Sequence, residues 1–106
     1  MPRYLFQASY TADGAKGLLK DGGSKRRAMV DEIVKSLGGK VEAFYYAFGD
    51  CDAIGIVELP DAASIVALSL AVNASGAVSL KTTVLLTPDE IDQAAKKTVR
   101  YRAPGN

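Results

Sequence analysis

The first segment of the chain alternates between aromatic and polar residues. From Arg3 to Thr11 aromatic and polar side chains recur with a period of two residues, which predicts a β-strand. Its aromatic positions are Tyr4, Phe6 and Tyr10. Thr11 then offers a hydroxyl cap for a short helical turn, which the pair Gly22-Gly23 should stop.

The next segment has the period of an amphipathic helix. Its apolar residues fall at positions i, i+3, i+4 and i+7 and therefore form one stripe. They are Val30, Ile33, Val34 and Leu37. Gly38-Gly39 follows directly and predicts a left-handed cap at the end of this helix.

Two segments rich in aromatic and β-branched residues then predict a hairpin. Residues 41–48 and 53–59 are separated by a turn that begins at Gly49-Asp50. In the second segment Ile54 and Ile56 lie on one face, whereas Val57 and Leu59 lie on the other. Apolar residues on both faces are typical of a central strand that is covered on both sides.

A more apolar helix is predicted from Ala62 to Ala74, with Asp61 as its cap. Its first stripe, which should face the sheet, consists of Ile65, Leu68 and Val72. Val66 and Leu70 form a second stripe on another side of the helix. The helix is therefore more apolar than packing against one sheet explains.

The last strand and a final helix complete the pattern. Residues 78–86 predict a strand, with Val78, Leu80, Val84 and Leu86 on one face. Thr87-Pro88-Asp89-Glu90 has the form of a capping box with proline at the first helical position, so a short helix should begin there.

The order of elements predicts an α+β fold of the ferredoxin-like, split βαβ type. It runs strand, helix, strand, strand, helix, strand, followed by a C-terminal helix, and it implies an antiparallel sheet with its helices on one face. We expect one domain over residues 1–98 and a flexible tail over residues 99–106. Because helices cover one face while the strands are apolar on both, we expect a second copy to cover the other face as a two-fold homo-oligomer.

Composition narrows the chemistry. The chain contains no His and a single cysteine, Cys51, which removes the commonest general base and metal ligand and every Ser-His or Cys-His pair. We therefore expect no cofactor and no metal. The formal net charge of +1 does not favour nucleic acid. No apolar segment has the length needed to span a membrane, and nothing marks the chain for export, so we expect a cytoplasmic protein.

Candidate ligand-binding residues lie in and before the hairpin turn. Asp50 and Asp52 flank Cys51, and two carboxylates can divide acid and base roles, although acidic turn residues more often bond to the turn backbone. The aromatic residues Tyr45, Tyr46 and Phe48 can line a cavity or form a core or dimer interface. The basic run Lys25-Arg26-Arg27 is interpreted as solvated surface.

The chain resembles the GYD-domain family over nearly its whole length. The resemblance lies in Phe48-Gly49-Asp50-Cys51-Asp52, Pro60-Asp61, Ser75-Gly76 and Leu86-Thr87-Pro88-Asp89-Glu90, and in Tyr10-Thr11, Gly14 and Leu37-Gly38-Gly39. Cys51 stands where the family usually has Tyr, while Gly49 and Asp52 match its Gly and Asp. The resemblance implies the dimeric α/β-barrel fold but no established reaction.

Three functional hypotheses remain open. The first is a small oligomeric binding or accessory protein that holds a small apolar ligand in the barrel. The second is a cofactor-independent enzyme of the dimeric α/β-barrel type, since related barrels include oxygenases. The third is a structural self-assembly unit, suggested by the second stripe on the apolar helix.

Overall fold

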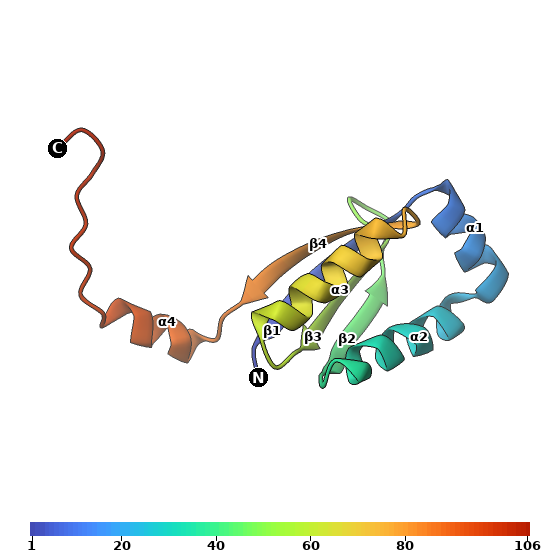
Figure 1. Ribbon diagram of the computed structural model, residues 1–106, viewed down its shortest axis with the longest axis horizontal. Helices are drawn as coiled ribbons and strands as arrows, with labels where there is room; N and C mark the ends of the chain where they lie inside the picture. The colour runs from blue at the N-terminus through green and yellow to red at the C-terminus, as the bar shows by residue number, and fades with distance from the viewer.

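A computed structural model describes all 106 residues and shows one antiparallel sheet packed against helices. The strands lie in the order β2-β3-β1-β4, and α3 crosses in front of the sheet in Figure 1. The elements in chain order are β1 (Arg3–Tyr10), α1 (Ala12–Asp21), α2 (Gly23–Ser36), β2 (Lys40–Tyr46), β3 (Ala53–Glu58), α3 (Ala62–Ala74), β4 (Val78–Leu85) and α4 (Pro88–Ala95). The predicted ferredoxin-like order is confirmed.

The first helical connection differs from its prediction. Ala12–Asp21 is a ten-residue helix instead of a short turn, and Thr11 caps it by accepting a hydrogen bond from the Gly14 amide. Gly14 and Gly17 weaken the helical signal in the sequence because glycine disfavours helix interiors. Gly14 is nevertheless required by packing, since a Cβ there would collide with the carbonyl oxygen of Ala77.

Glycines end both helices of this connection as the sequence predicts. Gly22, with φ of +81°, separates α1 from α2, and Gly38, with φ of +82°, follows α2. The amide of Gly39 donates to the Val34 carbonyl at 3.1 Å and that of Gly38 donates to the Lys35 carbonyl at 3.0 Å. These paired bonds form a Schellman motif, which satisfies carbonyls that the end of α2 would leave free.

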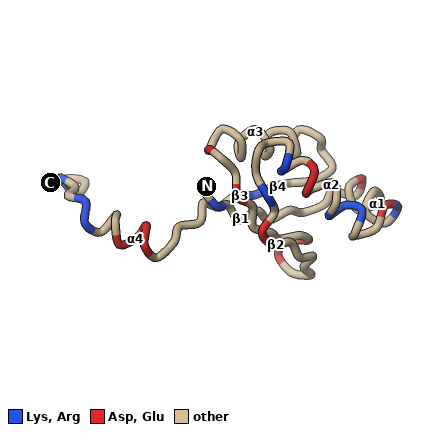
Figure 2. The backbone as a smooth tube through the Cα atoms, turned by 90° about the horizontal axis from the view of Figure 1, so that it is seen from below, with Lys and Arg blue, Asp and Glu red and all other residues tan.

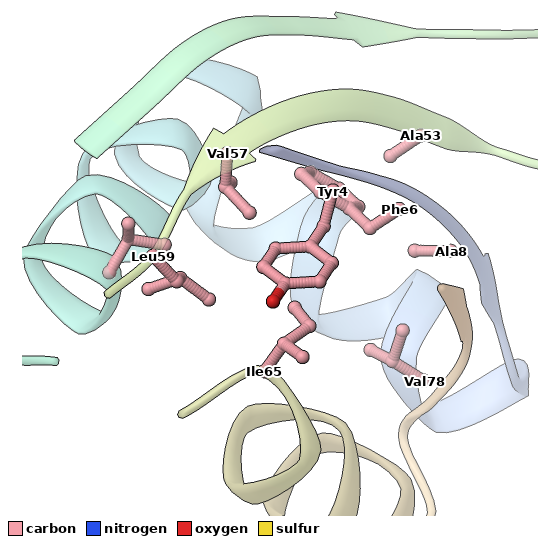
Figure 3. Packing of buried hydrophobic residues seen from close by; sticks show 9 residues of the cluster. Tyr4, Phe6, Ala8, Ala53, Val57, Leu59, Ile65 and Val78 are labelled. Atoms are coloured by element: carbon pink, nitrogen blue, oxygen red, sulfur yellow. The ribbon is translucent and has the colours of Figure 1, made fainter. Parts of the chain in front are cut away.

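The core lies between the sheet and the helices (Figure 3). Every second residue of β1 and β3 points into it, and Ile65 of α3 faces Tyr4 of β1 in the close view. The nine buried hydrophobic residues are Tyr4, Phe6, Ala8, Val34, Ala53, Val57, Leu59, Ile65 and Val78. Burying a side chain of the size of Val or Leu contributes about 1.5–3 kcal/mol, so each large member of this layer stabilises the fold.

The opposite face of the sheet is only partly shielded. Leu5 of β1 and Ile54 and Ile56 of β3 are half-buried there, and Tyr45 of β2 is 69% exposed. At one end of this face Arg3 pairs with Glu42 at 2.9 Å and with Glu58 at 3.0 Å, and Lys40 pairs with Glu58 at 3.3 Å. The predicted two-sided apolar sheet is thus present, with an ion-pair network at its border.

Strand β4 forms one edge of the sheet, and a side chain blocks this edge near the start of the strand. The Leu80 amide donates to Asn73 Oδ1 at 2.8 Å, while Asn73 Nδ2 donates to the Leu80 carbonyl at 3.4 Å. The side-chain amide of Asn73 on α3 therefore bonds to the backbone of Leu80 as the backbone of a neighbouring strand would. Such blocking restrains an exposed edge from pairing with another chain.

The C-terminal segment leaves the packed body after β4. The capping box of α4 is confirmed, because Thr87 accepts from the Glu90 amide and Glu90 accepts from the Thr87 amide. No residue of α4 is buried, and the segment projects far from the sheet in Figures 1 and 2. The radius of gyration is 16.9 Å, whereas a compact chain of this length would have about 13 Å. We call residues 86–106 the C-terminal arm.

Candidate functional site

The carboxylate of Asp52 ties the hairpin turn to β1. Its Oδ2 accepts a hydrogen bond from the Tyr10 amide at 2.8 Å. The backbone of Asp52 also donates to the Ala8 carbonyl and accepts from the Ala47 amide, both at 2.8 Å. Asp52 thereby continues the pairing of the strands beyond Ala53, and its position is half-buried.

The other predicted site residues do not gather around Asp52. Cys51 is half-buried and lies 4.0 Å from Gln7 Nε2. Tyr45 and Tyr46 are neighbours on β2 and point to opposite faces of the sheet. Phe48 and Asp50 lie in the turn and are exposed. The six candidate residues therefore surround one end of the sheet without forming a single pocket.

A groove that the sequence pattern did not predict lies between α3 and the α1–α2 pair. Its volume is about 470 Å³. Gly17 and Leu18 of α1 line one side, Leu68 and Val72 of α3 line the other, and Tyr10 lies at the sheet. Gly17 contributes no side chain to this wall, and a Cβ there would meet open space, with no neighbour within 4 Å.

A small cavity adjoins this groove inside the core. It measures about 50 Å³, and 13 of its 14 lining residues are hydrophobic. The exception is Arg26, which together with Tyr10, Leu68 and Val72 also lines the groove. A guanidinium thus stands where an apolar interior meets an open groove.

The basic run of α2 divides into three different environments. Lys25 is exposed and pairs with Asp21 at 3.6 Å. Arg27 pairs with Asp31 at 3.2 Å and lies over the ring of Phe44, 5.6 Å from its centroid. Arg26 is half-buried and takes part in none of the chain's ion pairs.

Two tyrosines accompany Arg26. The Tyr46 hydroxyl donates to the Gly23 carbonyl at 2.9 Å, which joins β2 to the start of α2. Partial burial, followed by the nearby Tyr10 phenol, raises the pKa of Tyr46, and the charge of Arg26 opposes this rise. The phenol is therefore neutral at physiological pH and keeps the proton that it donates to the Gly23 carbonyl.

The chain offers no cluster of metal-binding side chains, because nowhere do three or more His, Cys, Asp or Glu residues come together. No helix is sufficiently long and apolar to cross a bilayer.

Comparison with known proteins places this fold in a family. The model of the GYD domain matches residues 4–95, from the second residue of β1 to the last residue of α4. The chain belongs to the GYD-domain family. The expected resemblance is therefore confirmed.

One curated relative of this GYD domain has a functional name. It is the "Glutamine synthetase and cystathionine beta-lyase binding protein" of Thermus thermophilus, 29% identical over 82 residues. The match covers 77% of the present chain and 85% of the relative. No solved structure matches the chain.

The groove of this GYD domain leaves no local signal in the sequence, for a physical reason. One wall comes from the consecutive helices α1 and α2 and the other from α3, which is far from them in sequence, so only the tertiary fold brings the two walls together. Arg26 was visible as one of three consecutive cations, but nothing in the sequence distinguished it from Lys25 and Arg27.

Proposed function

We propose that this GYD-domain protein is a small accessory protein that binds another protein and carries no catalytic site of its own. The family and the name of the curated relative support a binding role. The partners named for that relative, glutamine synthetase and cystathionine β-lyase, are accordingly the first candidates here. A cytoplasmic setting and a small apolar ligand belong to the same proposal.

Self-association is the second part of the proposal, and the apolar, incompletely covered face of the sheet is the observation that supports it. We propose that a second copy of the chain covers it, sheet to sheet. Leu5, Ile54 and Ile56 form an apolar centre that two copies can share about a two-fold axis. The bordering network of Arg3, Lys40, Glu42 and Glu58 contains equal numbers of cations and carboxylates, so two such borders can meet without strong repulsion.

The dimer is tested by light scattering coupled to size exclusion. We expect a dimer for the natural chain and a folded monomer for Ile56→Lys, which places a charge in the centre of the face. Ala63→Lys is the matched control, because Ala63 is exposed in the first turn of α3. A natural chain that is monomeric at all concentrations would refute the sheet-to-sheet arrangement.

The partner role is tested separately. The purified chain is mixed with glutamine synthetase or cystathionine β-lyase from its own organism, and complex formation is measured by calorimetry and size exclusion. We expect saturable binding to at least one enzyme. Failure to bind either one would remove the proposal for these partners.

A second candidate function is assembly beyond the dimer. The exposed side chains of Val66 and Leu70 on α3 favour it, since they are 53% and 66% exposed. Asn73 weighs against assembly through the adjoining edge of β4, because its side chain already bonds to Leu80 near the start of that edge. Light scattering that shows dimers alone, even at high concentration, would eliminate this candidate.

A further inference from the structure

We propose that the groove between α3 and the α1–α2 pair binds a small organic carboxylate with an apolar body, and that Arg26 receives its carboxylate. The groove volume of about 470 Å³ lies within the range of about 300–1,000 Å³ typical of small-molecule sites. The proposal rests on the ligand-binding part of the function above and is independent of the protein partner.

The charge of Arg26 determines the head group of the ligand. A half-buried guanidinium without an ion-pair partner has lost part of its hydration and gains from an anion. Its neighbour Lys25 already neutralises Asp21, one of the two carboxylates on the groove wall. Asp13 is the other and lies in the first turn of α1, where the helix N-terminus offsets its charge.

The apolar wall determines the body of the ligand. Leu18, Leu68 and Val72 line the groove, and the adjoining cavity is almost wholly hydrophobic. At about 50 Å³ the cavity is too small for a ligand by itself, because even benzene needs an apolar cavity of about 150 Å³. It can receive the end of a chain or the edge of a ring that lies mainly in the groove.

Octanoate and 1-octanol are suitable probes, because they share an apolar chain and differ in the head group. Binding is measured by calorimetry on the full chain. We expect octanoate to bind more tightly than octanol. Arg26→Gln should weaken the affinity for octanoate by at least tenfold and change the affinity for octanol by less than twofold. The matched control is Lys35→Gln, an exposed cation on the same helix outside the groove, which should change neither affinity.

Substitution of Gly17 provides a test in which a loss of binding cannot be caused by a loss of folding stability. Gly17→Leu fills open space in the groove, and it also improves the helix propensity of α1. We expect this variant to bind neither probe while its melting temperature stays equal or rises. Gly17→Ala should gain the same helix stability and retain octanoate binding.

The site is refuted if the natural chain binds no octanoate at millimolar concentration, or if Arg26→Gln and Lys35→Gln behave alike. Octanoate binding that survives in Gly17→Leu would place the ligand elsewhere and would equally refute the proposed groove. Complex formation with either enzyme is scored in its own experiment, so failure of one proposal is distinguishable from failure of the other.

Discussion

Replacing Asn73 by alanine exposes the backbone of Leu80 on the β4 edge, and the structure gives the size of the effect. The substitution removes a bond of 2.8 Å from the Leu80 amide and a weaker one of 3.4 Å to the Leu80 carbonyl. An intramolecular hydrogen bond contributes about 0.5–1.5 kcal/mol net, so the pair contributes about 1.5 kcal/mol. Alanine returns about 0.5 kcal/mol through its better helix propensity. We therefore expect the free energy of unfolding to fall by about 1 kcal/mol.

Two measurements check this expectation. Urea unfolding reports the change in stability, and hydrogen exchange reports the Leu80 amide, which should exchange much faster in Asn73→Ala. Ser69→Ala is the control, because the Ser69 hydroxyl shares a hydrogen bond with the Thr82 hydroxyl and makes none to the backbone of β4. If the Leu80 amide exchanges equally fast in the natural chain and in Asn73→Ala, the side chain does not protect the edge and the reasoning is wrong.

Three further predictions concern the core and the titration of one tyrosine. Leu59 is fully buried, so Leu59→Ala should destabilise the fold by about 2–5 kcal/mol in urea unfolding, and a loss below about 1 kcal/mol would contradict its place in the core. Gly39→Ala would press a methyl group against the Glu58 carbonyl and should cost at least about 1–3 kcal/mol, whereas an unchanged midpoint would show that the backbone yields. The pKa of Tyr46 in the folded state is raised above 10.0. The free energy of unfolding should therefore fall as the pH rises from about 10 through this folded-state pKa. Absorbance titration should show a late phenolate signal that Tyr46→Phe removes, and spectra that are the same for the natural chain and this variant above about pH 10 would refute the shift.

Local patterns predicted most of the fold. The stripe of α3, the capping box of Thr87 and the glycine end of α2 depend on residues within a few positions of one another, and each appears in the structure. Helix α1 was predicted too short, because its two internal glycines, Gly14 and Gly17, weaken the helical pattern of the sequence. Gly14 is there for close contact with Ala77, a residue far along the chain.

The candidate sites were harder to predict because they depend on tertiary position. Tyr45 and Tyr46 are adjacent in sequence, yet the pleat of β2 sends them to opposite faces. Arg26 gained its importance from the groove, which exists only after α1 and α3 have packed. In the sequence, Asn73 is marked only as a polar residue near the second apolar stripe of α3. Its bonding to the edge of the sheet can be inferred only when β4 is known to lie beside that helix.

The projecting C-terminal arm should tolerate amino-acid changes differently from the packed sheet. Since α4 buries no residue, amino-acid changes there should leave cellular abundance nearly unaltered, whereas changes at the inward positions of β1 and β3 should deplete the protein. A saturation library scored first for abundance and then for fitness should therefore show little effect after Leu85 in the first screen. Any arm position that still mattered in the second would report what the arm touches in the cell, free of any contribution from folding.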